Sequence, residues 1–507
     1  MNRQLNIIDL FLQTAAGNPE RTAIIYKEQR VSFGDFKNSV IETAAYFKSK
    51  GIYAGDRVLV FVPMSIDLYR VALALFYMGA TAVFLDEWVS KKRLEECCKI
   101  ARCRAFVGTW KVRLLSFFSS ELRKIPVKLG VNYKKNSGDL PMHETLATDT
   151  ALITFTTGTT GTPKAAKRTH GFLKEQFDAL IEKINPREGE VDMPALPIVL
   201  MINLGAGSTS VIPEFKAGKP AEMNAEKIWQ QIKDHNVERI VSSPFFIKKI
   251  SEYIIENNIA TPGLQKIFTG GAPVFASEAA IYLKAFPGST IEIVYGSTEA
   301  EPISSINAAT LVNEKKDTPT KGLPVGAPYR KANVRIIKII SDAIQCNSIA
   351  ELDAITLPDS VIGEIIVSGP HVLREYFNND EALKQNKIFI GTDCWHRTGD
   401  SGYLENGKLY LTGRVNSLFE HNGQLITPFI YQELLQSIDG VVLGTVISHQ
   451  NKLTAVIELK ENSSSAEITE KILNSNTGIE SVMITKIPRD PRHHSRVDFE
   501  RLKKNIT

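Results

Sequence analysis

The sequence predicts an α/β protein in which a large N-terminal domain of layered sheets and helices is followed by a small C-terminal α+β domain. Its 507 residues are too many for one simple core, so at least two domains are expected. Short apolar runs alternate with stretches of helical periodicity, and the runs end in Ser, Gly, Pro or Thr. This pattern is typical of layered α/β sheets whose binding sites lie at strand ends. We place the domains at 1–413 and 414–507.

The individual elements follow from the same periodicities. In the large domain, apolar runs predict strands at 58–62, 81–85, 240–241, 266–268 and 291–294, and a helix near 66–78. In the small domain we expect helices from Pro428 and near 465–474, and strands near 441–448, 453–459 and 481–487.

No stretch of the sequence reads as a targeting or membrane-spanning segment. The apolar N-terminal residues are interrupted by Asp9 and Gln13 before a signal-peptide core can form. The longest apolar run, 72–85, is too short to span a bilayer and contains Gly79. We interpret this run as a buried helix that turns at Gly79 into a strand.

Composition and charge disfavour several classes of protein. With 43% hydrophobic and 23% charged residues, the chain resembles an ordinary globular protein. A net charge of +4 is small for this length and gives no reason to expect a nucleic-acid partner. The cysteines form neither a Cys-x-x-Cys pair nor a His/Cys cluster, which indicates reduced thiols in a cytoplasmic protein without a structural zinc site. They are Cys97, Cys98, Cys103, Cys346 and Cys394.

A loop rich in glycine and threonine follows an apolar strand at 151–155. Gly158 and Gly161 allow a tight turn whose backbone N–H groups face an anion, and Lys164 adds a point charge for phosphate oxygens. Further donors come from the hydroxyl groups of Thr156, Thr157, Thr159 and Thr160.

A helix that begins behind an N-cap at Thr169 is expected to follow this loop. A strand, a glycine-rich loop and a helix together form an arrangement that binds polyphosphates. A surface turn rich in Thr and Gly would have the same composition. The loop also lacks the Gly-Lys-Ser/Thr of a Walker motif, so it indicates a different family of phosphate-binding proteins.

The loop resembles the phosphate-binding signature of the adenylate-forming superfamily, which includes acyl-CoA synthetases, peptide-synthetase adenylation domains and luciferases. Segments similar to other motifs of that family follow in the family's order. They are Gly270-Gly271-Ala272-Pro273-Val274, Tyr295-Gly296-Ser297-Thr298-Glu299, Gly322-Leu323-Pro324-Val325-Gly326-Ala327-Pro328, Gly363-Glu364-Ile365, Thr398-Gly399-Asp400 and Gly413-Arg414. Each could be an ordinary turn on its own. Together, in this order and over most of the chain, they identify the chain as a member of the superfamily.

The resemblance implies an AMP-forming acid ligase that uses ATP and Mg²⁺. In such enzymes a carboxylate oxygen attacks the α-phosphorus of ATP and expels pyrophosphate, so the site must neutralise charge and align two anions. By resemblance, residues 156–164 hold the β- and γ-phosphates, with Lys164 as the cation. Thr298 contacts the α-phosphate, and Glu299 binds Mg²⁺, which prefers oxygen ligands.

The resemblance also assigns the nucleoside part of the site. The turn formed by Gly270, Gly271, Ala272 and Pro273 contacts adenine, and Tyr295 and Gly296 belong to the same nucleotide site. Asp400 accepts hydrogen bonds from both ribose hydroxyls, a role that suits a carboxylate with two oxygens. Arg414 fixes the ribose from the domain boundary.

Two positions depart from the usual family pattern. Most members carry a lysine near the C-terminus that bridges the carboxylate and the α-phosphate, and Arg496 stands at that position here. Arginine keeps the charge but is longer and forked, so the replacement is not neutral. In a different alignment, Arg492 would stand at this position.

The second departure is at the expected hinge, where Asn416 replaces the usual Asp or Lys. Asn tolerates unusual backbone angles, so rotation of the small domain as a mobile lid is still expected.

Three functions stay open at this point. The first is a fatty acyl-CoA ligase that transfers the acyl group from AMP to CoA. The second is a β-lactone synthetase, because the segments 295–302, 395–400 and 488–496 resemble the β-lactone-forming synthetases of bacterial olefin biosynthesis, which need no CoA. The third is a nucleotide-binding homologue with weakened catalysis, suggested by Arg496. His396, His493 and His494 could be acid–base groups, nucleotide contacts or structural residues.

The segment 196–207 lies where the family places its substrate entrance. It is aliphatic, which favours a hydrophobic small-molecule acid over an amino acid, although a buried core strand would look the same. The segment 205–210 lacks the third glycine of a dinucleotide-binding fingerprint, which argues against a dehydrogenase. Because the expected substrates are lipids, contact with a membrane surface or another enzyme of the pathway stays open.

Overall fold

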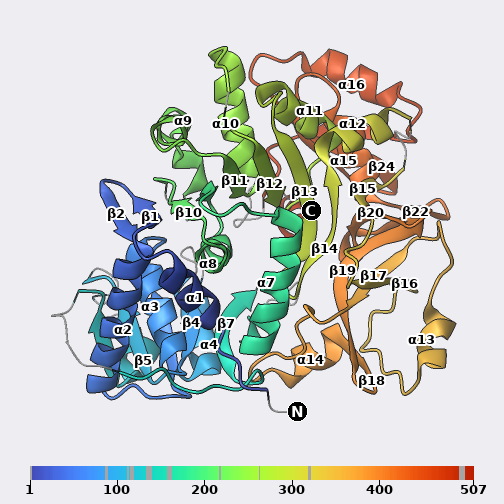
Figure 1. Cartoon of the computed structure of the whole chain (residues 1–507). Helices are drawn as coiled ribbons and strands as arrows, with labels where there is room; N and C mark the ends of the chain where they lie inside the picture. Colours follow the sequence, from blue (N-terminus) through green and yellow to red (C-terminus); the bar gives the residue numbers. More distant parts are fainter. Residues whose placement is uncertain are drawn as a thin grey trace.

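The computed structural model describes residues 3–85, 90–110, 114, 119–132, 140–156, 163–215, 219–261, 263–317, 321–489 and 497–506 (Figure 1). Three large sheets with their helices form the N-terminal part of the chain, and two small sheets with further helices form the C-terminal part. The predicted fold class, a large α/β part followed by a small α+β domain, is confirmed.

The first six-stranded sheet carries the strands on both sides of the predicted phosphate loop. Its order is β6-β5-β3-β4-β7-β8, and only β8 is antiparallel to its neighbour. Apolar side chains of this sheet pack against α2 and α3 on one face and against α4 and α6 on the other. The elements are β3 (Arg57–Phe61), β4 (Thr81–Phe84), β5 (Ala105–Gly108), β6 (Val127–Gly130), β7 (Thr150–Thr156), β8 (Lys164–Thr169), α2 (Phe33–Ser49), α3 (Ile66–Tyr77), α4 (Lys91–Ala101) and α6 (Ser120–Lys124).

The eight-stranded sheet has the order β14-β13-β12-β11-β9-β10-β1-β2, with a parallel run from β13 to β1. Helices α7 and α8 pack on one face, and α9, α10 and α11 pack on the other. The elements are α1 (Asp9–Gly17), β1 (Thr22–Tyr26), β2 (Gln29–Ser32), α7 (His170–Ile184), β9 (Val191–Pro194), α8 (Pro197–Ala206), β10 (Thr209–Val211), η1 (Pro220–Glu222), α9 (Ala225–Asp234), β11 (Arg239–Ser242), α10 (Pro244–Glu256), β12 (Lys266–Gly270), α11 (Ala276–Ala285), β13 (Thr290–Ser297), β14 (Ala300–Asn307) and α12 (Ala308–Asp317).

The third large sheet is antiparallel and has the order β15-β20-β19-β17-β16, with β18 paired to β19. It brings the predicted Thr398-Gly399-Asp400 and Gly413-Arg414 motifs together, because Asp400 faces Arg414 across the β19–β20 pair. The elements are β15 (Leu323–Gly326), β16 (Asn333–Ile337), α13 (Ile349–Ile355), β17 (Gly363–Ser368), α14 (Asp380–Asn386), β18 (Lys387–Ile390), β19 (Asp393–Glu405) and β20 (Lys408–Arg414).

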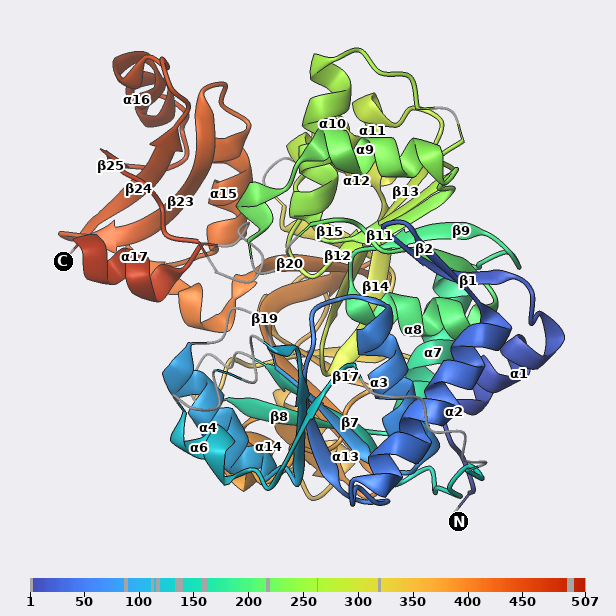
Figure 2. The ribbon, with the colours of Figure 1, turned by 90° about the vertical axis from the view of Figure 1, so that its left-hand side faces the viewer.

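The small C-terminal domain stands to one side of the large part (Figure 2). Its own apolar clusters lie between a three-stranded sheet, β23-β24-β25, and its helices. A buried ion pair joins it to the large part, with Nζ of Lys315 2.8 Å from Oε2 of Glu433. The elements are η2 (Val415–Ser417), β21 (Phe419–His421), β22 (Gln424–Ile426), α15 (Pro428–Gln436), β23 (Val441–His449), β24 (Lys452–Leu459), α16 (Ser465–Leu473), β25 (Ser481–Ile484) and α17 (Phe499–Ile506). The division at 413/414 stays a prediction.

The strands and helices expected from the periodicities are confirmed, with shifts of a few residues at their ends. Helix α3 ends at Tyr77, Gly79 adopts a positive φ of 72°, and β4 begins at Thr81, as interpreted for the run 72–85. In the described ranges, no helix has the length and apolar character needed to cross a bilayer.

The expected order of strand, loop and helix after residue 151 was wrong in one respect. A second strand, β8, lies between the loop and α7, and it pairs antiparallel with β7 from Thr156↔Lys164 to Thr150↔Thr169. The helix itself begins where predicted, because Oγ1 of Thr169 accepts a hydrogen bond from the N–H of Phe172 at 3.1 Å.

A network of buried charges supports the eight-stranded sheet. Arg239 is fully buried and forms ion pairs with Asp192 (Nε to Oδ1, 3.0 Å) and with Glu190. Its Nη2 also donates to Oδ1 of Asn203 at 2.8 Å, which ties α8 to β9 and β11. Charges without solvent need such partners, because an unpaired buried charge is costly.

Arg239→Met is expected to lower the free energy of unfolding by about 3 kcal/mol or more, because it leaves a buried carboxylate without its cation. Asp192 is the carboxylate that loses its cation, because Glu190 keeps a second one: Nζ of Lys266 is 3.3 Å from its Oε1. Urea denaturation measures the change. Arg330→Met is the control, because that arginine is 65% exposed in its surface pair with Glu182. Equal midpoints for the two variants would contradict the prediction.

Candidate active site

The predicted phosphate loop leaves and re-enters the first sheet at neighbouring positions. Thr156 is the last residue of β7 and faces Lys164, the first residue of β8. The Nζ atom of Lys164 donates to Oδ1 of Asn386 at 2.7 Å, so its ammonium group has a defined place. The loop residues Thr157, Gly158, Thr159, Thr160 and Gly161 lie outside the described residues.

Glu299 lies in the turn between β13 and β14, and it is 8% exposed. Its Oε1 accepts a hydrogen bond from the hydroxyl group of Tyr376 at 3.2 Å. Its backbone oxygen accepts one from the N–H of Leu373 at 2.7 Å. Two points of the segment 373–376 therefore hold Glu299.

The charge of Glu299 is stabilised by its surroundings. Burial raises the pKa of this carboxyl, but the neighbouring His396, Lys387 and Lys164 side chains, together with the Tyr376 hydroxyl, hold the pKa below its usual value. Burial and Lys387 lower the pKa of His396 to about 3, so this imidazole is neutral at pH 7. The two lysines are therefore the cations that keep Glu299 ionised at neutral pH.

Thr298 precedes Glu299 in the same turn. Its backbone oxygen accepts a hydrogen bond from Nη2 of Arg168 at 3.3 Å, which ties the turn to β8. The structure thus brings Lys164, Thr298 and Glu299 to one region from two different sheets. Lys164 and Glu299 are close enough to shift each other's pKa.

Asp400 lies at the centre of a second group of predicted residues. Its Oδ2 accepts from the hydroxyl group of Tyr295 at 2.8 Å, and its Oδ1 accepts from Nη1 of Arg414 at 2.6 Å. Burial and the Asp400 charge raise the pKa of Tyr295 well above its usual value, so Tyr295 acts as a hydrogen-bond donor at neutral pH. Both oxygens of the carboxylate are thus aligned by donors that surround it.

The predicted adenine-contacting turn follows β12 and lies beside Tyr295. Gly270 pairs with Val294 in the parallel β12–β13 ladder. A Cβ atom on Gly270 would lie 2.5 Å from the backbone oxygen of Val294, so only glycine fits. Gly271 adopts a positive φ of 87°, which favours glycine, and Ala272 and Pro273 complete the turn. Gly296 is similarly close-packed, with a would-be Cβ 2.8 Å from the oxygen of Ala300.

The residues expected near the C-terminus are not placed. Arg496, together with Arg492, His493 and His494, lies outside the described residues. Asn416 lies in the 3₁₀ turn η2, directly after Arg414, and is not among the residues with positive φ.

Tyr376, Asn386 and Lys387 belong to the site although the sequence did not single them out. Tyr376 contacts Glu299, Asn386 contacts Lys164, and Lys387 is buried near both. Only the position of Tyr376 between the Gly363-Glu364-Ile365 and Thr398-Gly399-Asp400 motifs could have drawn attention to it. His396, considered earlier as an acid–base group, is a buried neutral side chain whose Nδ1 donates to the backbone oxygen of Asn386 at 3.2 Å.

The segment 196–207 is a helix rather than a core strand. Pro197 occupies its first turn, and Gly207 ends it with a positive φ of 76°. The buried side chain of Asn203 donates through Nδ2 to Oδ2 of Asp192 at 2.6 Å. Most aliphatic side chains of this helix are buried in the core, and the buried charge network sets its position.

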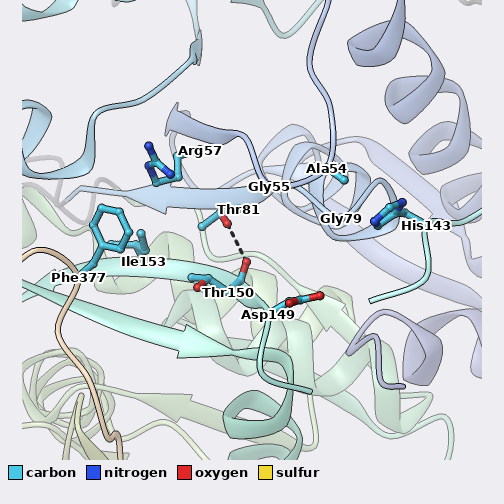
Figure 3. A pocket seen from close by; sticks show the side chains of 10 residues that line it. All are labelled: Ala54, Gly55, Arg57, Gly79, Thr81, His143, Asp149, Thr150, Ile153 and Phe377. Atoms are coloured by element: carbon cyan, nitrogen blue, oxygen red, sulfur yellow. Dashed lines mark hydrogen bonds between the residues drawn. The ribbon is translucent and has the colours of Figure 1, made fainter. Parts of the chain in front are cut away.

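A cavity of about 240 Å³ lies away from these residues (Figure 3). It is found where β3, β4 and β7 begin, opposite the end at which β7 enters the phosphate loop. Arg57, Thr81 and Thr150 contribute to its lining, and Oγ1 of Thr81 donates to the backbone oxygen of Thr150 at 2.7 Å. The cavity contains no predicted site residue, so it is not part of the candidate active site.

The donor set fits a magnesium ion that is held mainly by phosphate oxygens. Within the described ranges, no group of three or more His, Cys, Asp or Glu side chains could form a complete metal site. Mg²⁺ commonly takes one or two carboxylates and completes its shell with water and substrate phosphates. Glu299, beside the strand that leaves the phosphate loop, suits this arrangement.

Comparison with known proteins agrees with the motifs. Residues 11–377 match the AMP-binding enzyme family. The olefin beta-lactone synthetase of Xanthomonas campestris pv. campestris is 29% identical over 421 residues, which cover 78% of this chain and 73% of that protein. The olefin beta-lactone synthetase of Stenotrophomonas maltophilia is 25% identical over an alignment of 549 positions, which covers 99% of this chain and 98% of that protein.

The fold is shared with a solved enzyme. O-succinylbenzoate coenzyme A synthetase from Bacillus subtilis, in complex with ATP and magnesium ion, superposes with a TM-score of 0.80 at 20% identity, over 99% of this chain and 100% of that chain. The family match covers well over half of the sequence. The chain therefore belongs to the AMP-binding enzyme family and is an AMP-forming ligase of the adenylate-forming superfamily.

Proposed function

We propose that the protein activates a hydrophobic carboxylic acid, a fatty or β-hydroxy fatty acid, as its acyl-AMP, using ATP and Mg²⁺ and releasing pyrophosphate. One observation carries the proposal. The Asp400 carboxylate, aligned by Tyr295 and Arg414, lies in the same site as Lys164 and Glu299, because Tyr295 is near the end of β13 and Glu299 is in the turn directly after that strand. The charge of Arg414 also acts on Lys164. A ribose-binding carboxylate next to a cation and a metal-binding carboxylate suits a nucleoside triphosphate.

In this proposal each residue acts on a different part of the two substrates. The two oxygens of Asp400 accept from the ribose hydroxyls, and the close-packed turn at Gly270 and Gly271 lies against the adenine. Lys164 offsets the charge of the phosphates, and Glu299 holds Mg²⁺, which supplies the charge neutralisation that the attacking carboxylate requires. The bond between the acid oxygen and the α-phosphorus forms, and the bond to the leaving pyrophosphate breaks.

A hydrophobic acid is supported by helix α8. Its segment 196–207 has no charged side chain, and no carboxylate there could bind the α-amine of an amino acid. The relatives from Xanthomonas and Stenotrophomonas are named for olefin β-lactones, which also points to hydrophobic products.

The acyl-AMP has two candidate fates. In a fatty acyl-CoA ligase, the thiol sulfur of CoA attacks the acyl carbonyl carbon, AMP leaves, and the thiol proton is released. In a β-lactone synthetase, the oxygen of the substrate's own 3-hydroxyl group attacks that carbon, AMP leaves, the hydroxyl proton is released, and a four-membered ring closes. The motif 395–400 and the two named relatives favour the second fate. The similarity in fold to a coenzyme A synthetase keeps the first as the alternative.

ATP- and Mg²⁺-dependent pyrophosphate release tests the proposal. The full-length protein is assayed with chain-length-matched pairs of fatty acids and 3-hydroxy fatty acids, first without CoA and then with it. We expect continuous release with at least one hydrophobic acid and none without Mg²⁺. Multiple turnovers restricted to the 3-hydroxy series without CoA would support ring closure.

Other outcomes separate the alternatives. Release that stops after one equivalent until CoA is added would assign a thioester ligase. Absence of release with every acid of both series, while ATP still binds, would reject the proposal and favour a nucleotide-binding homologue with weakened catalysis.

A further inference from the structure

Lys387 is a buried lysine at the junction of α14 and β18. It is 3% exposed, and its Nζ atom donates to the backbone oxygen of Leu373. The same ammonium group lies over the ring of Tyr376, 5.7 Å from the ring centroid. Within the described ranges Lys387 forms no salt bridge, so carboxylates act on its charge only from a greater distance.

The two groups that Lys387 contacts are those that hold Glu299. The N–H of Leu373 donates to the backbone oxygen of Glu299 at 2.7 Å, and the hydroxyl of Tyr376 donates to its Oε1 at 3.2 Å. The segment 373–376 therefore lies between Lys387 on one side and Glu299 on the other. It also contacts the strand that leaves the phosphate loop, through a bridge between Tyr376 and Ala166.

Asn386, the residue before Lys387, holds the other charged group of the site. Its Nδ2 donates to the backbone oxygen of Ala382 at 2.7 Å, and this bond directs Oδ1 toward Nζ of Lys164, also 2.7 Å away. The backbone oxygen of Asn386 accepts from Nδ1 of His396. One dipeptide thus contacts Lys164 directly and Glu299 through one intervening segment.

A buried ammonium group is costly unless its surroundings compensate it. Burial lowers the pKa of Lys387 to about 8, and Cys394 and Glu299 act in the opposite direction, so most of the molecules carry this charge at pH 7. An apolar side chain of similar length would avoid the cost. The presence of lysine among site residues therefore indicates a role in the site.

We propose that Asn386 and Lys387 are positioning residues of the nucleotide site, where Lys387 sets the place of Glu299 through Leu373 and Tyr376, and Asn386 sets the place of Lys164. This inference rests on the proposed function, since it takes Glu299 as the metal-binding carboxylate and Lys164 as the phosphate-binding cation. Neither residue touches the reacting atoms, so each acts through its partner.

The test compares Lys387→Met, Lys387→Arg and Tyr376→Phe in the full-length protein. The matched control is Lys384→Met, which removes an exposed lysine of the adjoining helix, α14. The first readout is the Mg²⁺ concentration that gives half-maximal pyrophosphate release, measured beside the KM of the acid. The second is binding of Mn²⁺ in the presence of ATP without any acid, followed by electron paramagnetic resonance.

Lys387→Met is expected to raise the half-maximal metal concentration about 10-fold in both readouts, as is typical when the support of a metal ligand is lost. The KM of the acid stays unchanged, because the acid does not contact this support. Lys387→Arg restores at least part of the metal affinity, and Lys384→Met matches the unmodified protein.

The double variant Lys387→Met/Tyr376→Phe shows whether the two side chains act along one path. We expect the metal affinity of the double variant to equal that of the single variant that binds the metal more weakly, since both changes release the same carboxylate. Additive losses would overturn the proposed route through Tyr376. Unchanged Mn²⁺ binding in Tyr376→Phe, which removes only a hydroxyl group, would overturn it even if Lys387→Met does not fold.

The metal-binding readout separates this inference from the proposed function. If no acid supports pyrophosphate release but Lys387→Met still weakens Mn²⁺ binding with ATP, the proposed acid activation is wrong and the positioning role stands. If release proceeds normally and Lys387→Met leaves both metal readouts unchanged, the positioning role is wrong and the proposed function stands.

Discussion

Glu299→Gln is expected to lower the rate of ATP-dependent pyrophosphate release by about 1000-fold, the effect of losing roughly 4 kcal/mol of charge stabilisation in the transition state. The amide keeps the size of the side chain and an oxygen that accepts from the Tyr376 hydroxyl, but it removes the negative charge that Mg²⁺ needs. Lys164 and Lys387 also lose the carboxylate that they compensate. Rates at several Mg²⁺ concentrations measure the effect.

The matched control for this variant is Glu375→Gln. The side chain of Glu375 is 58% exposed in a surface pair with Lys167, so its removal is expected to leave the rate unchanged. Circular dichroism and thermal unfolding check that the Glu299 variant keeps its fold. A Glu299→Gln protein with full activity would show that the metal is held elsewhere.

Asp400→Asn is expected to raise the KM for ATP about 100-fold, since charge-assisted hydrogen bonds are worth roughly 1.5–3 kcal/mol each. An asparagine amide has one acceptor oxygen, so its NH₂ group would face either the Tyr295 hydroxyl or the Arg414 guanidinium, both of which are donors. The ribose would lose the carboxylate, and the two donors would lose their alignment. Steady-state kinetics with varied ATP at saturating acid measure the change.

Asp393→Asn provides the control for Asp400→Asn. It makes the same chemical change at an exposed position of the same strand, β19. We expect the KM for ATP of this variant to match that of the unmodified protein. If Asp400→Asn lowers kcat but leaves the KM for ATP unchanged, Asp400 does not bind the ribose in the ground state.

Elements with a strong local signal were predictable from the sequence. The strands β3, β4 and β12 are short apolar runs, and three consecutive residues of each are buried in the structure. Helix α7 begins directly after its N-cap, Thr169, and α15 begins at Pro428, because a hydroxyl cap and a proline favour the first turn of a helix. In each case the cause lies within a few residues of the element.

Strand β8 was missed because its pairing partner, and not its own residues, decides its structure. The six residues of β8, Lys-Ala-Ala-Lys-Arg-Thr, carry little strand propensity, and they become a strand by pairing with β7. Helix α8 was not predicted either, because its residues are apolar apart from Asn203, and periodicity could not distinguish a helix from a buried strand. Pro197 and Gly207 were the local signals for a helix.

The sequence by itself determined the family, because its motifs follow one another in the family's order along most of the chain. The roles that it assigns to Glu299 and Asp400 stay predictions. Only the tertiary structure decided what supports them. The hydrogen bond between Tyr376 and Glu299 joins residues 77 positions apart in the sequence, and the one between Asn386 and Lys164 joins residues 222 positions apart. A lone lysine such as Lys387 has no local signature, since its burial and its partners arise only when segments from separate sheets pack together.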